Sequence, residues 1–234
     1  MSKRRDLNGL VLRAKPYRET SLMVDVFTRE AGKLTGIQKG YRNRKGQRSI
    51  QPFLVGSLSA SGGDGLVNIY DFEVTENLVP RQQVAPGFYV LELVHRALGE
   101  RQVESHVFDV VLTVLRSLES SERPALRMLE RCLLDALGYG IDFLYAEDRA
   151  GDSCEIELDG LYEFVAGQGF LSSQSGRDTG EILLTGREIQ DIEREQYDSA
   201  KTAAQARRLY QAALIPLIGE QPLQSRRLLD PEHV

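Results

Sequence analysis

The first part of the chain shows a strand-like pattern of side chains. Residues 22–27 place Leu, Val and Val at alternate positions, a period of two that indicates a β-strand. Further strands are predicted at about 10–12, 34–38, 53–60 and 66–74, with turn sequences between several of them. Five short strands joined by tight turns predict a small barrel or sandwich, and we favour a five-stranded OB-type barrel.

The period becomes helical after Pro80 and Pro86. Apolar residues then recur every three or four positions, which predicts helices over about 88–98, 107–118 and 124–137. Pro124 suits the first position of the third helix, because its nitrogen has no hydrogen to donate there.

The last third of the chain contains a different segment. Residues 147–180 are rich in Gly, Ser and Asp, and we expect a short exposed β-hairpin from 155–165 and 169–173. Thr185 and Glu188 have the spacing of a capping box, and a last helix is expected from about Ala200 to Leu214. The predicted class is therefore α+β: an OB-type barrel in residues 1–80, then a helical bundle in 81–234 that carries the insert at about 147–180.

Charge is distributed very unevenly along the chain. The net charge is −5, but residues 1–50 hold 13 Lys+Arg and 4 Asp+Glu, so the remainder is strongly acidic. Such an asymmetry suggests a lobe that binds a polyanion, attached to an acidic body. A solvated basic surface without a partner is the alternative.

The densest cationic stretch runs from residue 33 to residue 48. Its cations can neutralise phosphates and release counterions, and Tyr41 can stack on a base or pack at a barrel edge. Tyr17 and Arg18 form a second aromatic and basic cluster, in which Glu19 can simply pair with Arg18. The candidate DNA-binding residues here are Tyr17, Arg18, Lys33, Lys39, Tyr41, Arg42, Arg44, Lys45 and Arg48.

Motifs for catalysis, metal binding or membrane insertion are not found. The sequence has no H-E-x-x-H motif, no G-x-S-x-G elbow and no phosphate-binding loop of the G-x-x-x-x-G-K-[ST] type. Cys132 and Cys154 cannot form a four-cysteine zinc site, and we expect no metal and no cofactor. No stretch approaches the roughly 20 apolar residues of a transmembrane helix, so a cytoplasmic protein without a membrane role is expected.

Several motifs together resemble one protein family. Residues 9–12, 17–22, 26–28, 32–33 and 39–42 (GLVL, YRETSL, VFT, GK, KGYR) are similar to the N-terminal signature of RecO, a recombination mediator. Residues 137–140, 184–187 and 222–229 (LGYG, LTGR, PLQSRRLL) match later landmarks of that family. Each motif is short, but their order and spacing cover nearly the whole chain.

This resemblance implies a function and a set of partners. RecO proteins bind single- and double-stranded DNA, promote annealing, work with RecR, and contact the tail of single-stranded DNA-binding protein to help load RecA. Some hold zinc with four cysteines in the inserted region, whereas only Cys154 lies there in this chain. An apolar groove with a nearby cation is implied for the tail, and Arg127 and Arg131 are the candidates, although either can pair with Glu130 instead.

The C-terminal Arg226 and Arg227 are the last candidates for DNA binding. They form either a clamp for DNA or a structural tether. We expect extended backbone there, which would direct the two side chains to opposite sides. Two other functions remain as alternatives: an adaptor whose basic lobe grips an acidic partner, and a hydrolase with an unrecognised site.

Overall fold

The chain folds into two compact units. One comprises Met1–Glu122 with Pro222–Val234, and the other comprises Arg123–Gln221. The predicted domain division near residue 80 falls within the first unit and stays a prediction. The computed structural model describes residues 4–40, 50–63, 65–82, 84–148, 150–173, 182–197 and 199–229.

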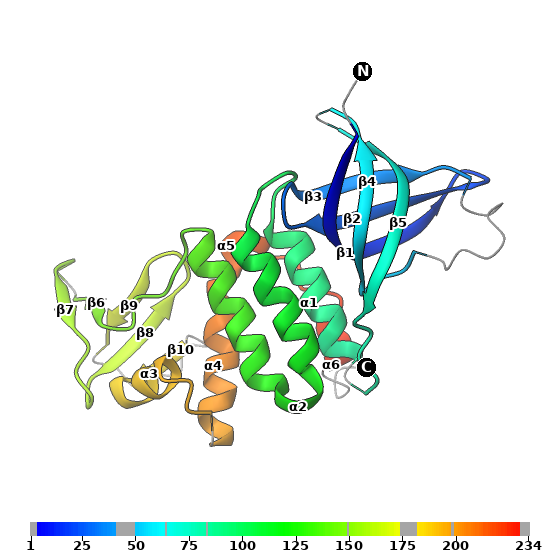
Figure 1. Ribbon diagram of the computed structural model, residues 1–234. Helices are drawn as coiled ribbons and strands as arrows, with labels where there is room; N and C mark the ends of the chain where they lie inside the picture. Colours follow the sequence, from blue (N-terminus) through cyan, green and yellow to red (C-terminus); the bar gives the residue numbers. More distant parts are fainter. Residues whose placement is uncertain are drawn as a thin grey trace. The chain divides into compact units, whose positions relative to one another are not determined.

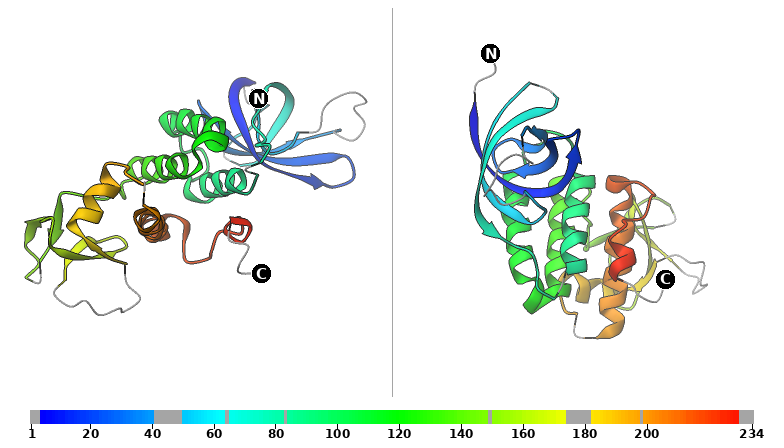
Figure 2. Two further views of the ribbon diagram at one scale, coloured as in Figure 1. Left: turned by 90° about the horizontal axis from the view of Figure 1, so that it is seen from below. Right: turned by 90° about the vertical axis from the view of Figure 1, so that its right-hand side faces the viewer.

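The first unit begins with a closed five-stranded barrel, drawn in blue to cyan in Figure 1. The order of its strands is β1-β2-β3-β5-β4, and only β3 and β5 are paired in parallel. In both views of Figure 2 the strands curve round a common interior. The predicted barrel and the α+β class are thus confirmed. The strands are β1 (Arg5–Tyr17), β2 (Ser21–Thr28), β3 (Gly32–Gln38), β4 (Leu54–Ser61) and β5 (Val67–Asn77).

Alternate side chains of these strands fill the barrel. Val11, Val24, Val26 and Leu58 are at most 1% exposed and belong to one apolar cluster. Gly56 lies where the pairing of β4 with β5 shifts register, and a Cβ atom there would be 2.1 Å from the carbonyl oxygen of Glu73. This position therefore requires glycine, because the backbone of the neighbouring strand occupies the space of a side chain.

Helices complete the first unit. The helix α1 (Val84–Ala97) buries most of its apolar residues, but Phe88, predicted for the same face, is exposed and contacts the ring of Phe53 edge-on. The short helix α6 (Arg226–Leu229) packs on α1, where the Glu92 carboxylate accepts hydrogen bonds from the backbone N–H groups of Gln224 and Ser225. These bonds fix the C-terminal segment to α1.

The predicted second and third helices form one element, α2 (Ser105–Ala136), which kinks at Ser121. Ser121 has non-helical angles, φ −152° and ψ 55°. Pro124 follows three residues later and lacks the N–H that would bond to the preceding turn, so the break lies just before it, as the sequence predicts. The division between the two units falls just after the kink, between Glu122 and Arg123.

The second unit contains a small sheet with strand order β10-β8-β9-β6-β7. The predicted hairpin is present as β8 and β9 but forms only the middle of this sheet, and residues 156–160, expected to be extended, lie outside β8. Thr185 and Glu188 form the predicted capping box. The elements are β6 (Tyr145–Glu147), β7 (Ser153–Glu155), β8 (Leu161–Val165), β9 (Gly169–Ser172), β10 (Ile182–Thr185), α3 (Gly186–Glu193), α4 (Ala200–Ala213) and α5 (Ile215–Ile218).

Candidate nucleic-acid interface

The outward side of β1 carries a row of polar and aromatic side chains. Arg13, Lys15 and Tyr17 occupy alternate positions of the strand, so they project to the same side. Ala14, between them, pairs with the buried Val24 and packs against the barrel core. Arg13, Lys15 and Tyr17 therefore face outward.

The neighbouring strands extend this row across the barrel. Lys15 lies opposite Met23 of β2, and Met23 lies opposite Ile37 of β3. Leu22 of β2 pairs with Gln38 of β3. The exposed Lys39, which follows Gln38, therefore lies beside Ser21, and Ser21 pairs with Tyr17 of β1. We call this set of outward residues the barrel face: Arg13, Lys15, Tyr17, Met23, Ile37 and Lys39. It combines cations with an aromatic ring and half-buried apolar side chains, and a cationic surface with aromatic stacking residues is typical of proteins that bind single-stranded nucleic acids.

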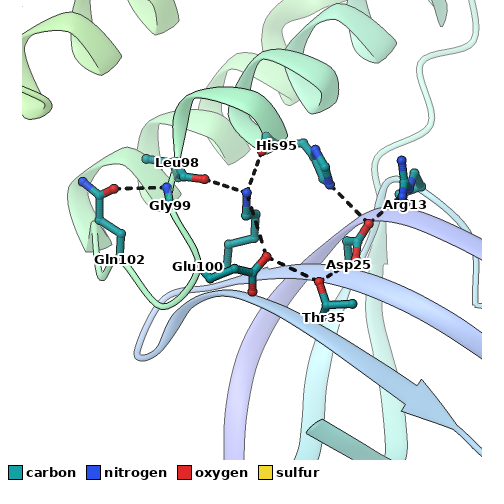
Figure 3. Close-up of polar contacts among 9 residues, drawn as sticks. Arg13, Asp25, Thr35, His95, Leu98, Gly99, Glu100 and Gln102 are labelled. Atoms are coloured by element: carbon teal, nitrogen blue, oxygen red, sulfur yellow. Dashed lines mark hydrogen bonds and ion pairs between the residues drawn. The ribbon is translucent and has the colours of Figure 1, made fainter. Parts of the chain in front are cut away.

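A polar network covers the other end of these strands (Figure 3). The Lys33 ammonium donates to the carbonyl oxygens of His95, at 2.7 Å, and Leu98, at 2.6 Å, near the end of α1. The carboxylate of Asp25 accepts a hydrogen bond from Thr35 at 2.8 Å and lies 3.1 Å from Nε of Arg13. The network therefore links the barrel to α1.

Asp25 is kept ionised by this network. Burial alone would raise its pKa, but hydrogen bonds from His95 and Thr35 and the positive charge of Arg13 outweigh burial and lower the pKa below its usual value. The His95 Nε2 atom lies 3.2 Å from the carboxylate. Because Asp25 is only 5% exposed, its negative charge is directed at these partners and not at the solvent around the barrel face.

The structure separates the predicted cations into different environments. Lys33 is 7% exposed and fully engaged with α1, so we leave it out of the interface. Arg18 is exposed, has a positive φ of 54°, and its guanidinium lies 5.3 Å from the centre of the Tyr17 ring. Five other predicted residues lie outside the described part of the chain: Tyr41, Arg42, Arg44, Lys45 and Arg48.

Two cations of the barrel face were missed in the sequence. Arg13 and Lys15 are exposed and stand four and two positions before Tyr17. The same alternation that predicts the strands would have placed all three on one side. The signal was present, but it was obscured by the denser cluster in residues 33–48.

Comparison with known proteins identifies the family of this chain. The models described as "Recombination protein O N terminal" and "Recombination protein O C terminal" match residues 1–78 and 82–147. A protein of Mannheimia succiniciproducens named DNA repair protein RecO is 36% identical over 225 residues, which cover 93% of this chain and 96% of that protein. The chain belongs to the RecO family.

Other RecO relatives match to the same extent. The DNA repair protein RecO of Haemophilus influenzae strain Rd is 34% identical over 94% of this chain and 93% of its own length. That of Pasteurella multocida is 35% identical over 94% of this chain and 92% of its own length. The N-terminal barrel is accordingly the OB-type domain of a RecO protein, and the suspected family is confirmed.

The predicted tail-binding arginines lie in the second unit of this RecO chain. The Arg127 guanidinium is bonded at 2.8 Å to Glu130, which is fully buried, and lies 5.7 Å from the centre of the Tyr210 ring. Arg131 is half-buried, donates to the carbonyl oxygen of Glu193 at 3.2 Å, and lies over the ring of Phe143. Arg127 is thus committed to a buried ion pair, whereas Arg131 keeps part of its surface exposed.

The two C-terminal arginines differ in environment, although the backbone is helical and not extended as expected. Arg227 is exposed, whereas Arg226 is half-buried with its Nε and Nη2 atoms shielded and without a hydrogen-bond partner among the described residues. The segment is attached to α1 through Glu92. Arg227 is therefore the more accessible of the two.

Two other classes of site were searched. Among the residues that the structure describes, no group of three or more His, Cys, Asp or Glu side chains is arranged to hold a metal ion. Within the same residues, no helix combines the length and the apolar character needed to cross a bilayer.

Proposed function

We propose that this protein is a DNA-binding recombination mediator whose barrel face contacts the sugar–phosphate backbone. The observation that carries the proposal is the row of exposed cations with Tyr17 on the outer side of β1–β3. In the sequence, β3 is followed almost at once by the cationic residues 41–49. Membership of the RecO family, whose relatives are named DNA repair proteins, supports it. We propose both single- and double-stranded DNA as ligands.

The mechanism follows from the character of this face. Lysine and arginine side chains neutralise phosphates without reading bases, so binding is independent of sequence. Tyr17 and the apolar side chains of Met23 and Ile37 offer a surface on which bases can stack or pack. Screening of phosphate repulsion lets two complementary strands approach, and annealing follows without an enzymatic step.

The wider role is also part of the proposal. We propose that the protein acts with RecR and the tail of single-stranded DNA-binding protein, and thereby assists the loading of RecA on DNA. It would work in the cytoplasm at the nucleoid. The family membership supports this role, and the acidic second unit provides a surface for proteins that DNA does not occupy.

For the tail of single-stranded DNA-binding protein, we favour Arg131 over Arg127 as the contact. Arg131 is partly accessible, whereas Arg127 is held by Glu130. Arg131→Ala is expected to weaken binding of a synthetic acidic tail peptide about tenfold, because a charge-assisted hydrogen bond contributes roughly 1.5–3 kcal/mol. Arg208→Ala, which removes an exposed arginine of α4, is the control. Equal affinities of Arg131→Ala and the wild type in a fluorescence titration would place the tail elsewhere.

The proposed function is tested with the purified protein alone. It is expected to retard single-stranded oligonucleotides of unrelated sequence equally at modest salt, and to accelerate annealing of complementary strands. A protein that binds no DNA without a partner would instead fit the adaptor alternative. Turnover of DNA into fragments would favour the hydrolase alternative.

A further inference from the structure

The second unit exposes a group of large apolar side chains around its small sheet. Tyr139 is 43% exposed, Leu144 62%, Tyr145 45% and Leu158 43%. A contiguous set of exposed apolar residues is a common mark of a protein contact. We call these four residues the sheet patch.

Two hollows join the members of the sheet patch. One, of about 430 Å³, is lined by Tyr139 and Tyr145. The other, of about 280 Å³, is lined by Tyr145, Leu144 and Leu158, with Phe143 and Ile156 beside them. Tyr145 lines both hollows and therefore links the two parts of the patch.

The position of β6 and β7 explains why this surface stays open. β7 is the edge strand of the sheet, as Figure 1 shows, and it pairs only with β6 among the described strands. Leu144 directly precedes β6, where its carbonyl oxygen accepts the N–H of Ile156 at 2.9 Å. Leu144 and Leu158 are thus held by backbone bonds and turns, while their side chains remain in solvent.

The charged side chains that line the two hollows are all acidic. Asp142 and Glu147 line the larger hollow, and Glu155 and Glu193 line the smaller one. Residues 138–163 contain eight acidic residues and a single basic one, Arg149. Within the described part of the chain, Glu147, Glu155 and Glu193 form no ion pair.

We propose that the sheet patch docks a segment of a partner protein in which leucine-like side chains alternate with lysine or arginine. The apolar side chains would fill the two hollows, and the cations would meet the carboxylates at their rims. Charge complementarity selects this occupant, because the carboxylates that line the hollows attract cations and would repel DNA. The inference concerns a surface that the proposed DNA binding does not use.

A synthetic peptide provides the test. The probe is a short, dye-labelled peptide in which leucine alternates with lysine, and the reference probe has serine in place of each leucine. Wild-type protein is expected to bind the leucine probe at least about tenfold more tightly than the serine probe in fluorescence anisotropy, since buried apolar area stabilises the complex. Leu144→Ser with Leu158→Ser is expected to abolish this difference.

A matched control excludes a general effect of surface polarity. Leu66 and Leu228, both exposed, lie in the first unit, and Leu66→Ser with Leu228→Ser is expected to retain the full preference for the leucine probe.

A second variant tests the carboxylates. Glu155→Gln with Glu193→Gln leaves the apolar side chains in place and is expected to weaken the binding of both probes at low salt. Equal binding of the two probes by the wild type, or an unchanged preference after Leu144→Ser with Leu158→Ser, would overturn the proposal. Tighter binding of a leucine–glutamate peptide would do the same.

The same variants keep this proposal distinct from the DNA-binding function. Leu144→Ser with Leu158→Ser is expected to bind single-stranded DNA as the wild type does. A parallel loss of DNA binding and peptide preference would mean that the sheet patch is no independent site. Loss of the peptide preference alone supports it, even if the wild type binds no DNA.

Discussion

Replacing Lys33 by methionine is expected to lower the free energy of unfolding by about 2 kcal/mol. The Lys33 ammonium donates to the carbonyl oxygens of His95 and Leu98, and no methionine atom can replace these bonds. Each hydrogen bond to a charged group contributes roughly 1.5–3 kcal/mol. Relief of the buried charge offsets part of the loss, because burial already lowers the pKa of Lys33.

A urea titration followed by circular dichroism measures this effect. Lys15→Met is the matched control, since it removes an exposed lysine of the same barrel and should change stability by less than about 0.5 kcal/mol. The folded Lys33→Met protein should bind DNA as the wild type does. An unchanged unfolding midpoint, or a loss of DNA affinity by the folded variant, would show that Lys33 does not act as a structural anchor.

Lys33 also shows where sequence reasoning reaches its limit. Residues 33, 35 and 37 project to the outer side of β3, and Lys39 follows the strand directly at the next alternate position, so the sequence makes Lys33 and Lys39 look equivalent. Only the packing of α1 over one end of the strand distinguishes them. The Lys33 ammonium donates a hydrogen bond to the carbonyl oxygen of His95 in α1, whereas Lys39 remains in solvent. The local sequence pattern predicts to which side of a strand a side chain projects. It does not predict which part of that side is covered by another element.

The elements themselves were largely predictable where their interactions are local. The capping box at Thr185 and the break before Pro124 both depend on neighbouring residues, and both are found. The second sheet was underestimated, because β6 pairs with β9 and β10 with β8 across long stretches of chain. At the C-terminus, Arg226 and Arg227 lie in a single helical turn that is attached to α1 by Glu92, a contact that no local pattern indicates.

The largest functional effect is expected when the cations of the barrel face and of the adjoining segment are removed together. The variant carries Lys15→Ala, Lys39→Ala, Arg42→Ala and Arg44→Ala. If each cation neutralises one phosphate, affinity for single-stranded DNA should fall about 100-fold or more at 0.1 M salt, because four counterions are no longer released. The loss should be similar for all DNA sequences, since phosphate contacts carry no base information.

A control variant removes positive charge from the same unit without touching the barrel face. Arg29 and Arg116 are exposed and paired with Asp109 and Glu76 at 3.0 Å and 2.6 Å. Arg29→Ala with Arg116→Ala should leave DNA affinity within about threefold of the wild type, because these cations face acids and exposed ion pairs contribute little. A loss comparable to that of the four-residue variant would indicate an effect of net charge alone.

The salt dependence of single-stranded DNA binding tests the central claim most directly. Fluorescence anisotropy with a labelled oligonucleotide gives the dissociation constant over a range of salt concentrations for the wild type and the four-residue variant. Wild-type protein is expected to show a log–log slope that exceeds that of the variant by about 3, from roughly 0.7 per lost phosphate contact. Equal slopes for the two proteins would contradict the assignment of the barrel face as the DNA-binding surface.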